Sequence, residues 1–156
     1  MKNKIKKYLK EFVLFIVVMT IFANALSLYR SLDLNKEALP AEFNVIKDKP
    51  VLVHFWATWC PVCKVEAPNI QTISENFQVI TIAVKSSDND EINKYLKENN
   101  LDFEFINDYD GSIAQKFGIS VYPTTIIYDK DRNVVFSDVG YTSTWGLWLR
   151  MLWAGM

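Results

Sequence analysis

The feature that most constrains the fold is an apolar run at residues 51–57 (VLVHFWA), which is followed three residues later by a pair of cysteines. The run is short and rich in β-branched and aromatic residues, which is typical of a strand buried on both faces of a parallel sheet. Residues 58–60 form a turn, and a helix is predicted from Pro61 to about Asn76. A buried strand therefore leads into a helix whose first turn carries Cys60 and Cys63.

The other patterns complete an α/β chain. A second buried strand is predicted at 78–85, a charged helix at 88–100, a short strand at 103–106 and a brief helix at 110–117. Two strands joined by a polar turn form a hairpin at 124–139, and an amphipathic helix follows from Thr142 to Leu152 or Trp153. Alternating strands and helices require parallel pairing, and the hairpin adds antiparallel pairing. A mixed central sheet flanked by helices is the layout of a thioredoxin fold.

The cysteines form the motif Cys60-Pro61-Val62-Cys63 at the start of the predicted helix. Thiol–disulfide exchange needs one exposed, acidified thiol that attacks and a second thiol that resolves the mixed disulfide. The free N–H groups and the positive dipole end of a helix stabilise a thiolate at its N-terminus. We therefore predict Cys60 as the nucleophile and Cys63, one turn behind it, as the resolving thiol. This redox-active disulfide is expected to need no further cofactor.

Three other interpretations of the motif compete with this one. A zinc site needs about four ligands, whereas the chain holds two Cys and one His. A purely structural disulfide would close too small a loop to stabilise much. A copper(I)-binding module, which soft thiolates would favour, is the rival from a different functional class, although the sequence around the motif is poor in further ligands. We assign no metal site.

The N-terminus combines five lysines within residues 2–10 with an apolar stretch from Phe12 to about Tyr29. These 18 residues are near the lower limit for a helix that crosses about 30 Å of hydrocarbon. The alternative is a cleavable signal peptide with a small-x-small site at residues 23–25, and a buried core helix is the least favoured interpretation. We favour a single transmembrane helix, because the apolar character continues past that site. Both favoured interpretations export everything after Arg30.

The predicted organisation is a basic segment and anchor (or signal peptide) at 1–30, a linker at 31–40 and a thioredoxin-like domain at 41–156. Six of the 17 Lys and Arg residues and one of the 18 acidic residues lie in the first 30, so the remainder carries 11 basic against 17 acidic residues. An acidic domain without a basic stripe argues against nucleic acid as a partner.

The segment VLVHFWATWCPVCKVEAP resembles the active-site segment of membrane-anchored, extracytoplasmic thioredoxin-like proteins of the TlpA, ResA and ScsD group, and it is most similar to the ScsD-like branch. The resemblance extends from Phe43 to the C-terminus. It implies that Pro123 is a cis-proline facing the disulfide and that the backbone beside it pairs with an extended substrate segment. The residues predicted to bind substrate are Trp59, Pro61, Val62, Tyr122, Pro123 and Thr124.

Two further residues are candidates for proton transfer. The resemblance matches Glu66, one turn beyond Cys63, to a carboxylate near the dithiol in ResA-like proteins, where it would raise thiol pKa values and could pass a proton to Cys63. A solvated helix carboxylate is the equal alternative. His54 stands on the buried strand where ordinary thioredoxins have an acid thought to deprotonate the resolving cysteine. A satisfied core histidine is the favoured interpretation, and a base is the alternative.

The resulting functional prediction is a protein thiol–disulfide oxidoreductase on the periplasmic or extracytoplasmic side of the inner membrane. It would exchange disulfides with exported proteins and, as a reductase, receive electrons from a membrane thiol carrier; a disulfide-donating oxidase is the alternative. Two sets in this helix, Trp145, Leu149 and Leu152 or Trp148 and Trp153, have helical spacing and are predicted to pack in the core. Contact of this helix with the membrane surface or a partner is the less favoured hypothesis.

Overall fold

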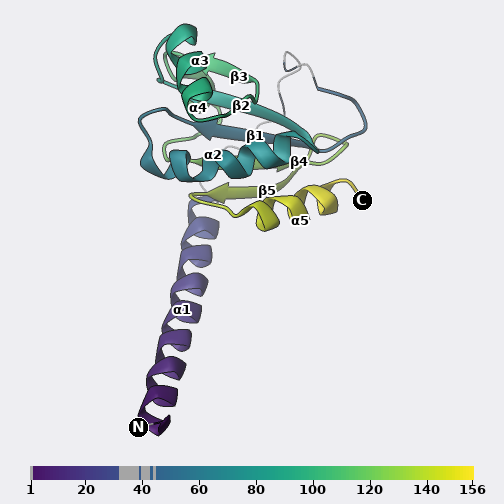
Figure 1. Ribbon diagram of the computed structural model, residues 1–156. Helices are drawn as coiled ribbons and strands as arrows, with labels where there is room; N and C mark the ends of the chain where they lie inside the picture. Colours follow the sequence, from purple (N-terminus) through teal and green to yellow (C-terminus); the bar gives the residue numbers. More distant parts are fainter. Residues whose placement is uncertain (1, 32–38, 40–42, 44) are drawn as a thin grey trace.

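The computed structural model describes residues 2–31, 39, 43 and 45–156 (Figure 1). Its helices are α1 (Lys2–Ser31), α2 (Pro61–Ser74), α3 (Asn89–Glu98), α4 (Ser112–Lys116) and α5 (Thr144–Ala154). Its strands are β1 (Val51–Trp56), β2 (Gln78–Val84), β3 (Phe105–Asp108), β4 (Thr124–Tyr128) and β5 (Val134–Val139). Apart from Ser31 and Leu39, the predicted linker at 31–40 lies outside the described residues.

The described strands form one mixed sheet in the order β3-β2-β1-β4-β5. β1 pairs parallel to β2, and β2 pairs parallel to β3. β4 runs antiparallel to β1, and β5 runs antiparallel to β4. All six residues of the central β1 are buried, which explains its almost unbroken apolar sequence. The prediction of a mixed α/β thioredoxin-like fold is confirmed.

Helices cover both faces of the sheet (Figure 1). Leu52 and Trp56 of β1 belong to a buried cluster that also takes in side chains from α2, α3 and α5. Val53 and Phe55, which alternate with them along the strand, belong to a second cluster with Phe117 and side chains of α4. Each face of β1 therefore has its own apolar layer, and the face under α2 is the one that supports the cysteine motif.

The boundaries of the predicted elements agree with the structure within one to three residues. The strand predicted at 103–106 is shifted along the chain and begins at Phe105. Phe103, where the predicted strand starts, is buried without being in the strand. Its ring packs edge-on against Trp56, with 5.7 Å between the ring centroids. Its apolar character therefore reflects core packing by a loop residue.

The prediction of which residues of the last helix face the core is wrong. The buried residues of α5 are Leu147, Met151 and Ala154. The residues predicted to face the core are all exposed: Trp145, Trp148, Leu149, Leu152 and Trp153. Apolar residues surround most of this helix, so both faces satisfy helical spacing and the spacing alone could not select the inner one.

The N-terminal residues form the long helix α1, which extends away from the sheet and contacts β5 at its C-terminal end (Figure 1). The predicted anchor at 12–29 lies within it, but the side chains of residues 20, 23, 24 and 26–29 are outside the described part. Among the described residues, no helix has the combined length and apolar character that a membrane crossing requires. The structure therefore does not confirm the single transmembrane helix.

Candidate active site

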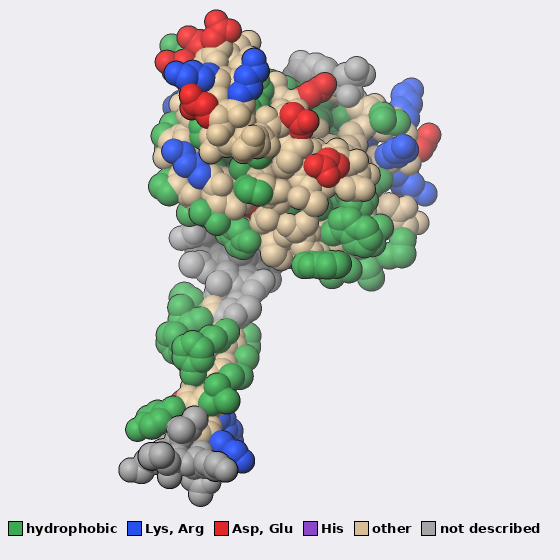
Figure 2. Space-filling view, in the orientation of Figure 1, with side chains coloured by type: hydrophobic (Ala, Val, Ile, Leu, Met, Phe, Trp, Pro, Cys, Tyr) green, Lys and Arg blue, Asp and Glu red, His purple; other side chains and the backbone are tan. Residues whose placement is uncertain are grey.

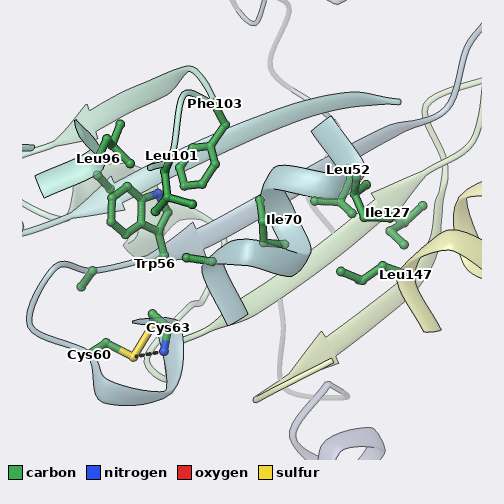
Figure 3. Close-up of a cluster of buried hydrophobic side chains, with 14 of the residues drawn as sticks. Leu52, Trp56, Cys60, Cys63, Ile70, Leu96, Leu101, Phe103, Ile127 and Leu147 are labelled. Carbon is green, nitrogen blue, oxygen red and sulfur yellow. Dashed lines mark hydrogen bonds between the residues drawn. A yellow bond between two sulfur atoms is a disulfide. The ribbon is translucent and has the colours of Figure 1, made fainter. Parts of the chain in front are cut away.

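A disulfide joins Cys60 to Cys63 at the N-terminus of α2 (Figure 3). Cys60 is the N-cap residue and Pro61 follows at the first helical position, where a missing N–H leaves no bond unmade. Cys60 Sγ accepts a hydrogen bond of 3.2 Å from the backbone N–H of Cys63. This donor and the positive end of the helix dipole would both stabilise a thiolate at Cys60 once the disulfide opens.

The turn before the motif is attached to the loop that follows β2. The backbone N–H of Thr58 donates to Ser86 Oγ at 3.0 Å, and Trp59 Nε1 donates to the Lys85 carbonyl at 3.0 Å. Trp59 is nevertheless 58% exposed, and its ring lies edge-on to Tyr122, with 5.8 Å between the centroids. The structure thus holds Trp59 at the surface beside Cys60, and its role in substrate binding stays a prediction.

The Tyr122-Pro123-Thr124 segment lies opposite the disulfide. The peptide bond between Tyr122 and Pro123 is cis, and the Tyr122 carbonyl oxygen is 3.6 Å from Cys60 Sγ. The Pro123 carbonyl accepts a hydrogen bond from Gly140 N–H at 2.8 Å. Thr124 is buried, and its hydroxyl donates to the Val121 carbonyl at 2.7 Å. The Thr124 side chain therefore braces the turn, and Tyr122 is the residue of this segment that reaches the sulfur.

The expected exposed thiol is not seen in this oxidised form. Cys60 is only 4% exposed and Cys63 only 2%, because the sulfurs face each other and Cys60 Sγ is turned toward the Cys63 N–H and the Tyr122 carbonyl. Val62, between the cysteines, is 44% exposed. Trp59 and Val62 are therefore the exposed side chains next to Cys60 in the chain.

A row of polar side chains crosses the sheet beneath α2. His54 of β1 pairs in register with Thr125 of β4, which in turn pairs with Asp138 of β5. Residues that face each other across paired strands point to the same side of a sheet. His54 points to the same side of β1 as Leu52 and Trp56, two residues before and after it, so the row lies on the face that α2 and α5 cover. Polar groups at such depth are rare unless they are hydrogen-bonded or functional.

Glu66 is the buried acid of α2, so the alternative of a solvated helix carboxylate is wrong. Its residue is 0% exposed, and Oε1 accepts a hydrogen bond of 2.9 Å from Thr142 N–H. Oε2 is buried without a hydrogen-bond partner in the described structure. Burial raises the pKa of Glu66 from 4.5 to about 8; the Thr142 bond acts against this, and the charge of Asp138 raises the pKa further. A buried carboxyl on the Cys63 face of α2 is thus mostly protonated at neutral pH.

Asp138 is a residue of this site that sequence analysis missed. Its Oδ1 lies 3.2 Å from Arg150 Nη2, whereas its Oδ2 is buried without a hydrogen-bond partner among the described atoms. Burial raises the pKa of Asp138, and the Arg150 charge works in the opposite direction. The signal was present in the alternation of β5, because Asp138 shares the inward side of that strand with Phe136, which packs on the same cluster.

His54 is a core residue, as the favoured interpretation predicted. It is 2% exposed, and Nδ1 lies 2.9 Å from Thr125 Oγ1. Burial lowers the pKa of His54 to about 3, so the imidazole is neutral at pH 7 and adds no positive charge to this face of the sheet.

We predict that His54 limits stability in acid. The unfolded chain binds a proton at this imidazole below pH 6.5, whereas the folded protein does so only near pH 3. As the pH falls through this interval, the free energy of unfolding should decrease by up to about 1.4 kcal/mol per pH unit. Above pH 6.5 His54 should cause no such loss of stability. His54→Gln keeps a hydrogen-bonding group beside Thr125 but does not titrate. Urea unfolding at pH 4, 5, 6 and 7 should show a smaller acid slope in the variant, and equal slopes would contradict the assignment.

The fold and the disulfide together define a thioredoxin-like thiol–disulfide oxidoreductase, in which a Cys-x-x-Cys pair opens the helix that follows the central strand. The chain belongs to the AhpC/TSA family, whose model matches residues 31–137. Among the described residues, no group of three or more His, Cys, Asp or Glu side chains is placed to hold a metal ion.

Known relatives agree with this class. The chain is 30% identical to a thioredoxin-like protein of Haemophilus influenzae over 97% of both chains. It is 35% identical to the thiol:disulfide interchange protein DsbE of Pseudomonas aeruginosa over 61% of this chain, and it spans only 53% of that protein. A secreted disulfide oxidoreductase of Mycobacterium tuberculosis has a similar structure, with a TM-score of 0.60 and 27% identity over 68% of this chain and 82% of its own. The chain is accordingly an enzyme of the thiol–disulfide oxidoreductase type.

Proposed function

We propose that this protein exchanges disulfides with exported proteins through Cys60 and Cys63, and that it acts as a reductase. The observation that carries the proposal is the position of Cys60 Sγ. It accepts a hydrogen bond from the Cys63 N–H at the helix N-terminus and lies 3.6 Å from the Tyr122 carbonyl oxygen, and the neighbouring residues Trp59 and Val62 are exposed. An extended partner segment that lies along Tyr122 would bring its own disulfide to this sulfur. The Cys60–Cys63 pair carries the electrons, so no other cofactor is required.

The chemistry follows from two exchanges of sulfur partners. The Cys60 thiolate attacks one sulfur of a partner disulfide, forms a mixed disulfide and releases the other partner sulfur as a thiolate. The Cys63 thiol then loses its proton and attacks Cys60 Sγ, which forms the Cys60–Cys63 disulfide and releases the second partner sulfur. The partner has gained two electrons, and a membrane thiol carrier must return two electrons to the enzyme.

Glu66 is the group proposed to hold the Cys63 proton. It lies one turn from Cys63 on the buried face of α2, and its pKa of about 8 is close to that of an ordinary thiol. Proton transfer between groups of similar pKa is efficient in both directions. The minor ionised form of Glu66 can therefore take the proton when Cys63 attacks, and the protonated form can return a proton when the disulfide is reduced. Asp138 would support this role by keeping the pKa of Glu66 high.

The charges around the motif favour the reductase direction. A strongly oxidising disulfide is one whose reduced form is stabilised, and nearby positive charge would stabilise its thiolate. On this face of the sheet His54 is neutral at pH 7 and Arg150 is paired with Asp138. Glu66 and Asp138 contribute only acidic groups. None of these four side chains adds an unpaired positive charge that would stabilise the thiolate, as expected for a weaker oxidant.

The proposed location is the extracytoplasmic face of a membrane, with residues 12–29 as a single-pass anchor and residues 41–156 as the domain. The described apolar side chains of α1 from Tyr8 to Phe22 are 46% to 67% exposed on all sides of the helix. A helix that is apolar all round is normally buried in protein or in lipid, and in the described structure α1 projects into solvent. A signal peptide is the alternative for this segment, and membership of the ScsD-like branch stays a prediction.

The reduction potential tests the direction of electron flow. Full-length protein in detergent would be equilibrated against defined thiol–disulfide buffers and the oxidised fraction measured. We expect a potential near or below about −250 mV, in the range of thioredoxin. A potential near about −120 mV, typical of a disulfide donor, would overturn the reductase proposal in favour of an oxidase.

A further inference from the structure

Helix α5 has an apolar face that the fold does not use. Its inner face, formed by Leu147, Met151 and Ala154, is buried against the sheet. On the other side lies a row of large side chains at helical spacing, which we name the outer face of α5. It consists of Trp145, Leu149, Leu152 and Trp153, which are 43% to 75% exposed, with the less exposed Trp148 at its edge.

The chemistry of the outer face fits the interface of a lipid bilayer. Tryptophan is enriched where membrane meets water, because its ring is apolar and its N–H remains hydrogen-bonded. Three of the five tryptophans of the chain lie on α5. The helix contains no acidic residue, and Arg150, its single charged residue, is paired with Asp138. The outer face therefore offers an apolar aromatic surface without charges that would resist burial among headgroups.

The position of α5 supplies the second argument. The end of α1 contacts β5, and only four residues separate the end of β5 from the start of α5. In Figure 1, α5 lies on the side of the sheet from which α1 extends, and its axis runs crosswise to that of α1. Figure 2 shows hydrophobic side chains on the underside of the domain, facing the direction in which α1 projects. A membrane that contained α1 would therefore face this side of the domain.

We propose that the outer face of α5 rests on the surface of the bilayer in which α1 is inserted, so that the domain lies against the membrane at a fixed orientation. The inference rests on the proposed membrane anchor and adds a second, independent contact to it. It also gives the exposed apolar residues of the outer face, among them Trp145, Leu149 and Trp153, a role that core packing does not supply. The disulfide site is kept near the membrane, where the proposed thiol carrier resides.

The test is tryptophan fluorescence of the full chain in vesicles of phosphatidylcholine and phosphatidylglycerol that carry bromine on the upper part of the acyl chains. Bromine quenches tryptophans that enter the interface. The anchor contributes no tryptophan fluorescence, since α1 contains no tryptophan. Trp145→Ser/Trp153→Ser removes two of the three α5 tryptophans, and the matched control Trp59→Phe removes the exposed tryptophan beside the disulfide.

We expect the brominated vesicles to quench the wild-type chain and the Trp59→Phe control to a similar extent. Quenching should fall at least about twofold in the double variant, since its outer face is interrupted and two reporters are lost. Because both replaced rings are exposed, the variant should keep its disulfide and its urea unfolding midpoint, which a parallel measurement verifies.

Three outcomes would overturn the proposal, and flotation of the vesicles on a density gradient separates them. If the chain does not float with the vesicles, both the anchor and the docking fail, whereas the thiol chemistry is unaffected. If it floats and bromine does not quench the α5 tryptophans, the anchor stands and the docking is wrong. If the same tryptophans are then shielded from aqueous iodide in a concentration-dependent way, a second copy of the chain covers the outer face instead.

Discussion

Replacing Cys63 with serine is expected to leave Cys60 joined to its partner protein in a stable mixed disulfide. The Cys60 thiolate can still attack a partner disulfide, but the introduced hydroxyl is far less acidic than a thiol and cannot release the product. The complex should appear as a higher-mass band on non-reducing gels of membranes from cells that express Cys63→Ser. Mass spectrometry of that band would identify the exported partner and confirm Cys60 as the bonded residue.

The paired variant Cys60→Ser supplies the control. It is expected to form no such complex, because Cys63 is inside the first turn of α2 and lacks the N-cap position at which the helix N-terminus stabilises a thiolate. Each variant should reduce a protein disulfide no faster than the reaction without enzyme. If Cys60→Ser trapped partners and Cys63→Ser did not, the roles of the two cysteines would have to be exchanged. If neither trapped a partner, the mixed-disulfide mechanism would be rejected.

The fold and the cysteine pair were predictable because their signals are local. The sequence at 51–63 contains a buried strand, a turn and a helix start in immediate succession, and each part has a distinct pattern. The N-terminal position of Cys60 on α2 follows from the same short segment. The hairpin of β4 and β5 was equally clear, because two apolar runs flank a polar turn.

The polar row beneath α2 could not be predicted, because it depends on strand pairing. His54, Thr125 and Asp138 are far apart in the chain, and only the registers of β1 with β4 and of β4 with β5 bring them into line. The burial of Glu66 likewise depends on the loop that contains Thr142, which closes over α2. The core face of α5 was missed for a different reason, since that helix is apolar on two sides and tertiary packing decides which one faces inward.

Replacing Glu66 with glutamine is expected to stabilise the oxidised protein above pH 8. The folded protein keeps a proton on Glu66 up to about pH 8, whereas the unfolded chain releases it near pH 4.5. Stability that depends on this proton is therefore complete below pH 4.5 and is lost as the pH rises to 8. At about 1.4 kcal/mol per pKa unit, the loss amounts to about 3 to 5 kcal/mol. Glutamine has the shape of the protonated acid and never ionises, so it should escape this loss.

Urea unfolding of the oxidised proteins at pH 5 and pH 8.5 would measure the effect. The oxidised form is required because its cysteines do not titrate. The variant and the wild type should be similar at pH 5, and the variant should be the more stable by several kcal/mol at pH 8.5. Glu75→Gln is the matched control, since Glu75 is the exposed C-cap residue of the same helix. Parallel pH profiles for wild type and Glu66→Gln would show that Glu66 ionises normally.

The same substitution separates a structural from a catalytic role for the buried acid. If Glu66 only filled space, glutamine would preserve or improve every property of the protein, because it keeps the acceptor for Thr142 N–H and removes a costly charge. If Glu66 exchanges a proton with Cys63, the more stable variant should resolve mixed disulfides more slowly, and the rate should lose its dependence on a group titrating near pH 8. A gain in stability coupled to a slower resolving step is a combination that packing alone does not produce, because the substitution leaves the fold intact and changes only where the Cys63 proton can go.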